Sequence, residues 1–133
     1  MKTNIQQRYQ LATNDLDQAW EEMCRPSTDV VTYSACVGSR RALHQFLQVL
    51  IATEGDETVL DKSLTMQELI DMGSTMNQKL NEIDFSQIHC QCDYILDDGH
   101  EEVRYCDSVA KVQTCVDLAR NVQSIINEKD STA

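Results

Sequence analysis

Glycine and proline are scarce in this chain, whose 133 residues include four glycines and one proline. Strand-rich domains need many tight turns, and these two residues supply much of the turn geometry. The composition therefore argues against a sandwich or a barrel and favours long helices with few connections. Long apolar runs are also missing, since none approaches the roughly 18 residues of a membrane-spanning helix, and we expect no contact with a membrane.

A basic excess is missing as well, because 22 acidic and 11 basic residues give a net charge of −11. Proteins that bind nucleic acid usually present a basic face, since neutralising phosphates supplies much of the affinity. We therefore expect any RNA contact to be local. The basic residues available for such a contact are Arg8, Arg25, Arg40 and Arg41.

The first ten residues, MKTNIQQRYQ, are polar and lack the apolar segment of a signal peptide. We accordingly expect a cytoplasmic protein, in which thiols stay reduced and the six cysteines form no disulfides. Three of the cysteines lie at apolar helical positions, where a thiol behaves as a small hydrophobic group. These three are Cys36, Cys106 and Cys115.

Apolar residues recur at steps of three and four along the chain, which predicts an all-α fold in a single domain over residues 1–133. Thr65 and Glu68 have the spacing of a capping box, in which each side chain satisfies a free amide of the other residue. Gly55 is expected to end the second helix with a positive φ. The expected helices cover about 4–24, 28–54, 66–83, a short 85–96, and 101–128.

The last expected helix carries a second apolar stripe beside its main one. A helix on the surface of a monomeric bundle needs one buried face. The extra width indicates either a central position in the bundle or a subunit interface, and we expect a homodimer. The second stripe consists of Cys106, Ala110, Cys115, Leu118 and Ile125.

Several segments resemble a known family in their order and spacing. Segment 39–55, SRRALHQFLQVLIATEG, is similar to the central helix of the HEPN family (higher eukaryotes and prokaryotes nucleotide-binding). Segment 12–19, ATNDLDQA, is similar to the family's first helix. Segment 63–69 lies where the family begins its third helix, and Arg104 and Tyr105 match an Arg-Tyr pair of many minimal members.

The resemblance implies a four- to five-helix up-and-down bundle that dimerises through its long helices. Many HEPN proteins act beside a small nucleotidyltransferase, and others are ribonucleases or toxins. The ribonucleases resemble one another in an arginine that is followed, after four to six residues, by a histidine. No arginine here has a histidine in that window, because three and two residues separate Arg40 and Arg41 from His44.

The sequence therefore identifies no catalytic residue and favours a non-catalytic module, which binds a nucleotide or another anion or serves as the partner subunit of a nucleotidyltransferase. Two alternatives stay open: a ribonuclease or toxin with a displaced arginine–histidine pair, and a purely structural dimer. We expect no cofactor. The predicted anion-contacting residues are Arg40, Arg41 and His44, followed by Arg104 and Tyr105.

A metal site is the remaining possibility that the motifs raise. The candidates are His89, Cys90, Cys92 and His100. Structural zinc sites usually present two cysteines separated by two to four residues, whereas Cys90 and Cys92 are separated by one. On a helix, side chains two positions apart diverge. We therefore predict no native metal centre.

Overall fold

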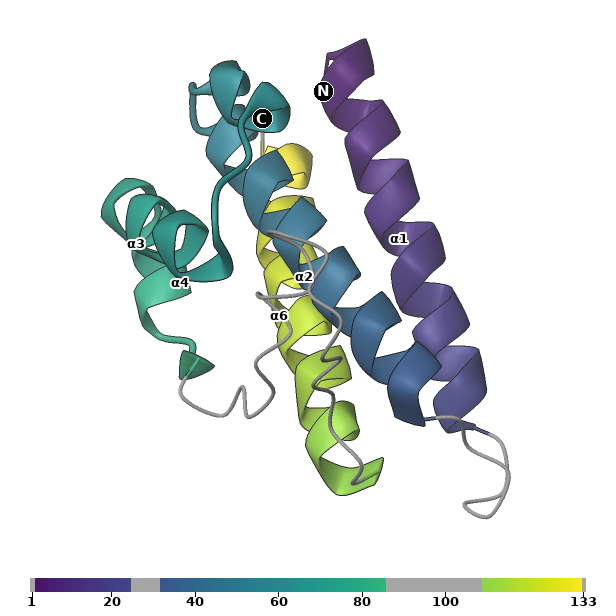
Figure 1. The fold of residues 1–133 in the computed structure, drawn as a ribbon. Coiled ribbons are helices and arrows are strands. Elements are labelled where there is room, and N and C mark those ends of the chain that lie inside the picture. Colours follow the sequence, from purple (N-terminus) through teal and green to yellow (C-terminus); the bar gives the residue numbers. More distant parts are fainter. Residues whose placement is uncertain (1, 25–31, 86–108, 133) are drawn as a thin grey trace.

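A computed structural model describes residues 2–24, 32–85 and 109–132, and every regular element within these ranges is helical (Figure 1). The prediction of an all-α chain is thus confirmed for this part of the molecule. No helix in these ranges combines the length and the apolar character needed to cross a bilayer. The elements are α1 (Thr3–Met23), α2 (Thr32–Thr53), the 3₁₀ helix η1 (Glu57–Asp61), α3 (Met66–Met76), α4 (Gln78–Asn81) and α6 (Val109–Thr132).

The long helix α2 lies at the centre of the fold. It packs against both α1 and α6, and α1 runs antiparallel to these two helices (Figure 1). The short elements η1, α3 and α4 follow α2 in the chain, and η1 and α3 pack against it. Residues from all six elements join one apolar core, and α2 supplies the largest share of it. Its contribution is Ala42, Leu43, Phe46, Leu47, Val49, Leu50, Ile51 and Ala52.

A polar and aromatic contact joins the three long helices at one end of the bundle. The rings of Tyr9 in α1 and Phe46 in α2 meet edge to face, with 5.6 Å between their centroids. The hydroxyl of Tyr9 donates a hydrogen bond of 2.7 Å to Oδ1 of Asn127 in α6. The half-buried tyrosine thus places its ring in the core and its hydroxyl at the surface, as aromatic residues with a polar end commonly do.

The connection after α2 begins as the sequence predicts. Gly55 has a φ of 128°, in the region that glycine tolerates best. Asp56 then caps η1, its carboxylate accepting a hydrogen bond of 3.2 Å from the Thr58 amide. The capping box of α3 is also present, since Glu68 N donates to Thr65 Oγ1 and Thr65 N donates to Glu68 Oε1.

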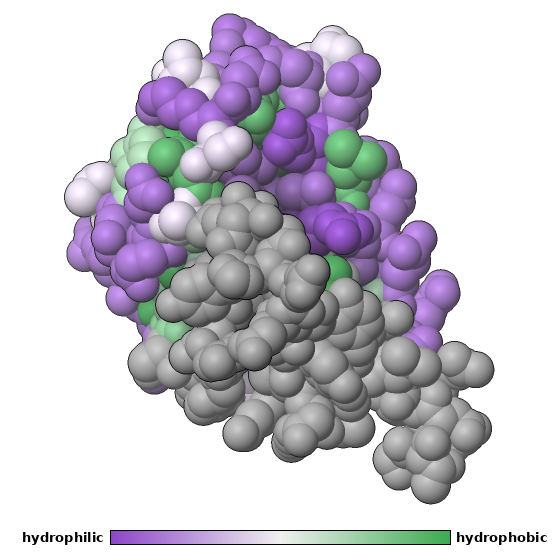
Figure 2. All heavy atoms as spheres, in the orientation of Figure 1, coloured by the Kyte–Doolittle hydropathy of each residue, from purple (hydrophilic) through white to green (hydrophobic). Residues whose placement is uncertain are grey.

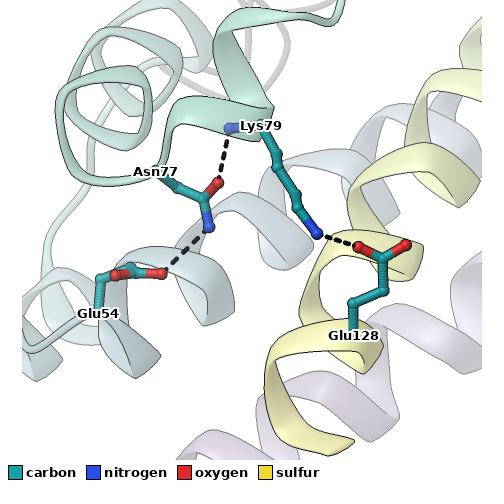
Figure 3. Close-up of polar contacts among 4 residues, drawn as sticks. All are labelled: Glu54, Asn77, Lys79 and Glu128. Atoms are coloured by element: carbon teal, nitrogen blue, oxygen red, sulfur yellow. Dashed lines mark hydrogen bonds and ion pairs between the residues drawn. The ribbon is translucent and has the colours of Figure 1, made fainter. Parts of the chain in front are cut away.

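The predicted helix over 66–83 is wrong in its second half. The chain leaves helical geometry at Asn77, whose φ and ψ are −139° and 115°, and a separate short helix α4 follows. Asn77 Oδ1 accepts a hydrogen bond of 2.9 Å from Lys79 N, and its Nδ2 donates one of 3.1 Å to Glu54 Oε1 (Figure 3). Lys79 forms an ion pair with Glu128 of α6. These contacts fasten the turn to the ends of α2 and α6.

The other boundaries differ less from those expected. Helix α1 covers 3–23 and α2 ends at Thr53, each within one residue of its predicted limit. Helix α6 continues to Thr132, beyond the predicted end at 128. The predicted helix starts at 28 and 101, and nearly all of the short helix over 85–96, lie outside the described residues.

The second apolar stripe of the last helix is buried within the protomer. Cys115, Leu118 and Ile125 are at most 8% exposed, and the leucine and isoleucine belong to the main core. Cys106 and the side chain of Ala110 lie outside the described part. Of the two explanations that the sequence left open, the central packing of the helix accounts for these three residues. The homodimer stays a prediction, without support from this stripe.

Substitution by alanine is expected to change the free energy of unfolding in opposite directions at Gly73 and Gly38. A Cβ added at Gly73 would lie 2.5 Å from Leu80 Cδ2, and Leu80 is fully buried. We expect Gly73→Ala to lower the free energy of unfolding by about 1 kcal/mol, because overpacking costs roughly 1–3 kcal/mol and the gain in helix propensity returns about 1 kcal/mol.

Gly38 is the matched control for this change. A Cβ at this position meets its neighbours at 3.5 Å, which is an ordinary contact. Gly38→Ala in the middle of α2 should raise the free energy of unfolding by roughly 0.5–1 kcal/mol. Urea unfolding of both variants measures the difference, and equal changes of the same sign would contradict the close packing of Gly73 on Leu80.

Candidate functional site

A depression of about 400 Å³ opens where α1, α2 and the connection from η1 to α3 meet. The described part of the face shown in Figure 2 is largely hydrophilic, with small apolar areas between the polar side chains. We call this hollow the basic depression. Its lining residues are Arg8 of α1, Arg41, His44, Gln45 and Gln48 of α2, Leu60 and Asp61 of η1, and Lys62, Ser63 and Leu64 of the connection.

The polar lining of α2 follows from helical geometry. Arg41, His44, Gln45 and Gln48 are related by steps of three and four, so their side chains share one face of the helix. The intervening positions Ala42, Leu43, Phe46 and Leu47 are apolar and lie in the core. The turn at Gly55 and the helix η1 then bring the following chain back across this polar face. Backbone carbonyls of this segment thereby lie within hydrogen-bond distance of His44 and Gln48.

Side chains of the depression hold the connection in place. Arg8 donates through Nη1 to Gln48 Oε1 at 2.7 Å and through Nη2 to the Leu60 carbonyl at 3.1 Å. Gln48, which is 3% exposed, donates through Nε2 to the Val59 carbonyl at 3.4 Å. The last carbonyls of a helix such as η1 need partners of this kind when they are removed from water. Arg8 and Gln48 therefore have a structural task in addition to any contact with a ligand.

His44 makes a similar contact further along the connection. Its Nε2 lies 2.7 Å from the carbonyl oxygen of Leu64. A carbonyl can only accept, so Nε2 carries the hydrogen and donates. The other ring nitrogen, Nδ1, is then the atom at which the imidazole gains or loses a proton.

The charge of the basic depression is opposite to that of the chain. Its described lining includes three permanent cations, Arg8, Arg41 and Lys62, and one carboxylate, Asp61, which sum to +2 with His44 neutral. The complete chain carries −11. Cations from two helices and from the connection thus converge on one hollow, an arrangement that concentrates positive potential and attracts anions.

Asp15 of α1 adds a negative group close to this region. Burial raises the pKa of its carboxyl above the ordinary value, and the nearby guanidinium of Arg41 partly offsets that effect. Asp15 does not belong to the described lining of the basic depression. The side chain of Arg41 thus lines the hollow and also interacts electrostatically with Asp15, which lies outside the lining.

The structure separates the residues that the sequence proposed as one cluster. Arg41 and His44 line the basic depression together, one helical turn apart. Arg40 is 2% exposed and does not line it, since adjacent residues of a helix point about 100° apart. Arg104 and Tyr105 lie outside the described residues.

The sequence reasoning overlooked the contribution of Lys62 and the two glutamines. The signal for Gln45 and Gln48 was present, because they continue the polar face of Arg41 and His44 along an otherwise apolar helix. The sequence indicates Arg8 only as one of four basic residues available for a local RNA contact. Neither Arg8 nor Lys62 could be assigned to the hollow from sequence, because the fold alone brings their segments together.

The metal candidates receive no structural description. His89, Cys90, Cys92 and His100 all lie between residues 86 and 108, outside the described part. Within the described ranges, no group of three or more metal-ligating side chains comes together. Cys36 and Cys115 are fully buried, as their apolar positions in the sequence predicted.

Comparison with known proteins completes the description of the site. No family model, no curated protein and no solved structure matches this chain. The likeness to HEPN proteins therefore stays a prediction from the segments quoted above.

Proposed function

We propose that this protein is a non-catalytic helical module that binds a compact anion, such as a nucleotide, in the basic depression. One observation carries the proposal. Arg8 of α1, Arg41 of α2 and Lys62 of the connection, together with Asp61, give the described lining a net charge of +2 in a chain of −11. Such a concentration of charge against the overall balance is costly unless an anion offsets it, so it points to a ligand-binding role.

The arrangement favours a small ligand over a polymer. A nucleic-acid backbone is held by cations that extend along a groove or a face. Here the cations surround one hollow, and a volume of about 400 Å³ falls in the range of small-molecule sites. The remaining net negative charge of the chain would repel the rest of a long polyanion. The likeness of segments 12–19 and 39–55 to HEPN proteins supports a nucleotide as the ligand, and is consistent with a partner subunit of a nucleotidyltransferase.

Titration calorimetry with sulfate and with AMP tests the proposal, with adenosine as the uncharged comparison. We expect saturable binding of both anions and none of adenosine. Arg41→Gln should weaken binding about tenfold or more, because a hydrogen bond to a charged group contributes roughly 1.5–3 kcal/mol.

Lys79→Gln is the matched control, since it removes one positive charge from an exposed ion pair with Glu128 that does not line the hollow. Its affinity for sulfate should stay within about twofold of the parent, because exposed ion pairs contribute little. Equal weakening by both substitutions would show a general charge effect and would overturn the assignment of the site.

A second candidate function is supported by one observation. Arg41 and His44 line the same hollow, so an RNA-cleaving member of the HEPN type with a displaced pair would have its cation and its proton-transferring group there. Incubation of purified protein with RNA separates the two functions. We expect no cleavage, and cleavage that His44→Ala abolishes would replace the non-catalytic proposal.

A further inference from the structure

His44 differs from its charged neighbours in the basic depression. Among the described lining residues it is the only histidine, and the charged neighbours are Arg8, Arg41, Asp61 and Lys62. Histidine is the side chain whose charge ordinarily changes between about pH 5 and pH 8. A proton added to His44 would therefore change the charge of the described lining.

The hydrogen bond of His44 to the Leu64 carbonyl is compatible with both the neutral and the charged ring. Both the neutral and the charged ring can donate from Nε2 to the Leu64 carbonyl at 2.7 Å. Protonation at Nδ1 adds a positive charge without breaking the contact that holds the connection. The proton can therefore alter the charge of the hollow while the fold around it is kept.

Charged groups surround His44 in the described part of the hollow. An anion bound among them would favour an additional positive charge on the ring. In the described part of the chain, the charged groups at this site are Arg8 and, outside the lining, Asp15 from α1, Arg41 from α2, Asp61 from η1, and Lys62 from the connection. Gln45 and Gln48 are neutral.

We infer that anion binding in the basic depression is coupled to proton uptake at His44 Nδ1, so the affinity for a compact dianion rises as the pH falls through the neutral range. The inference rests on the proposed binding function and adds its regulation. By reciprocity, the factor by which protonation strengthens anion binding equals the factor by which the anion strengthens proton binding.

Sulfate is the appropriate probe, because it stays a dianion across the neutral range and any pH dependence then belongs to the protein. We expect the sulfate affinity to increase at least about fivefold between pH 8 and pH 6, the lower end of typical coupling between sites. Calorimetry in two buffers of different ionisation enthalpy should show proton uptake on binding.

His44→Gln is the diagnostic variant, since its amide can donate to the Leu64 carbonyl but cannot titrate. Its sulfate affinity should be independent of pH. Asp15→Asn is the control for the neighbouring carboxyl, and it should keep the pH dependence of the parent. An NMR titration of the His44 ring in the unmodified protein, with and without sulfate, gives the same information if the glutamine variant fails to fold.

The outcomes separate the inference from the function beneath it. Sulfate binding that is sensitive to Arg41→Gln but constant with pH overturns the proton coupling alone. A sulfate affinity that still depends on pH in His44→Gln but no longer does so in Asp15→Asn assigns the proton to Asp15 and also overturns the inference. No saturable sulfate binding at either pH overturns the proposed function and the inference together.

Discussion

Phe46→Ala is expected to lower the free energy of unfolding by about 3–5 kcal/mol, the usual cost of truncating a buried phenylalanine. Phe46 is fully buried in α2, the helix that packs against both α1 and α6. Its ring also forms the edge contact with Tyr9. Removing it takes apolar area out of the core and leaves a cavity between the long helices. Urea unfolding followed by circular dichroism measures the change.

Two further substitutions limit the interpretation of that result. Phe46→Leu keeps most of the volume and should cost less than about 1.5 kcal/mol. Leu11→Ala removes a side chain that is 54% exposed, and its effect should stay within about 0.5 kcal/mol. A loss of less than 1 kcal/mol for Phe46→Ala would contradict the placement of α2 at the centre of the fold.

Arg8→Met is expected to weaken both the fold and the site. The change removes the donors to Gln48 Oε1 and the Leu60 carbonyl and leaves the buried amide oxygen of Gln48 without this partner. We expect the free energy of unfolding to fall by about 1–3 kcal/mol, the usual cost of leaving a buried polar group unsatisfied. Sulfate affinity should fall as well, because one of three cations leaves the basic depression.

Arg8→Lys separates these two effects. Lysine keeps the positive charge but lacks the planar fork that reaches two acceptors at once. Its stability should therefore be close to that of Arg8→Met, while its sulfate affinity should be closer to that of the parent. Urea unfolding and sulfate titration of both variants provide the comparison. A lysine variant with unchanged stability would show that the two hydrogen bonds of Arg8 contribute little to holding the connection.

The sequence was sufficient for those parts of the fold that depend on local patterns. Helical periodicity located α1 to within one residue at each end, and the pair Thr65 and Glu68 located the start of α3. The break at Asn77 was missed because its side chain stabilises the turn partly through Glu54, which is distant in sequence. Helix η1 was missed because its five residues are too few to establish a periodicity.

The candidate site was only partly predictable for the same reason. The sequence proposed Arg40, Arg41 and His44 as one cluster, and two of these, Arg41 and His44, line the same hollow. Arg40, next to them in sequence, is buried and lies outside that lining, which depends on how α2 packs. Arg8 and Lys62 reach the hollow from segments on either side of α2 in the chain. No local sequence pattern predicts that these two segments lie close together in the fold.

A crystal structure of the protein grown with selenate, a heavier relative of sulfate with strong anomalous scattering, tests the central claim most directly. We predict an anomalous peak in the basic depression, with selenate oxygens within hydrogen-bond distance of Arg41 and Lys62. The peak should be absent from crystals of Arg41→Gln grown in the same way. An empty depression in the parent protein, at selenate concentrations that saturate binding in solution, would contradict the account.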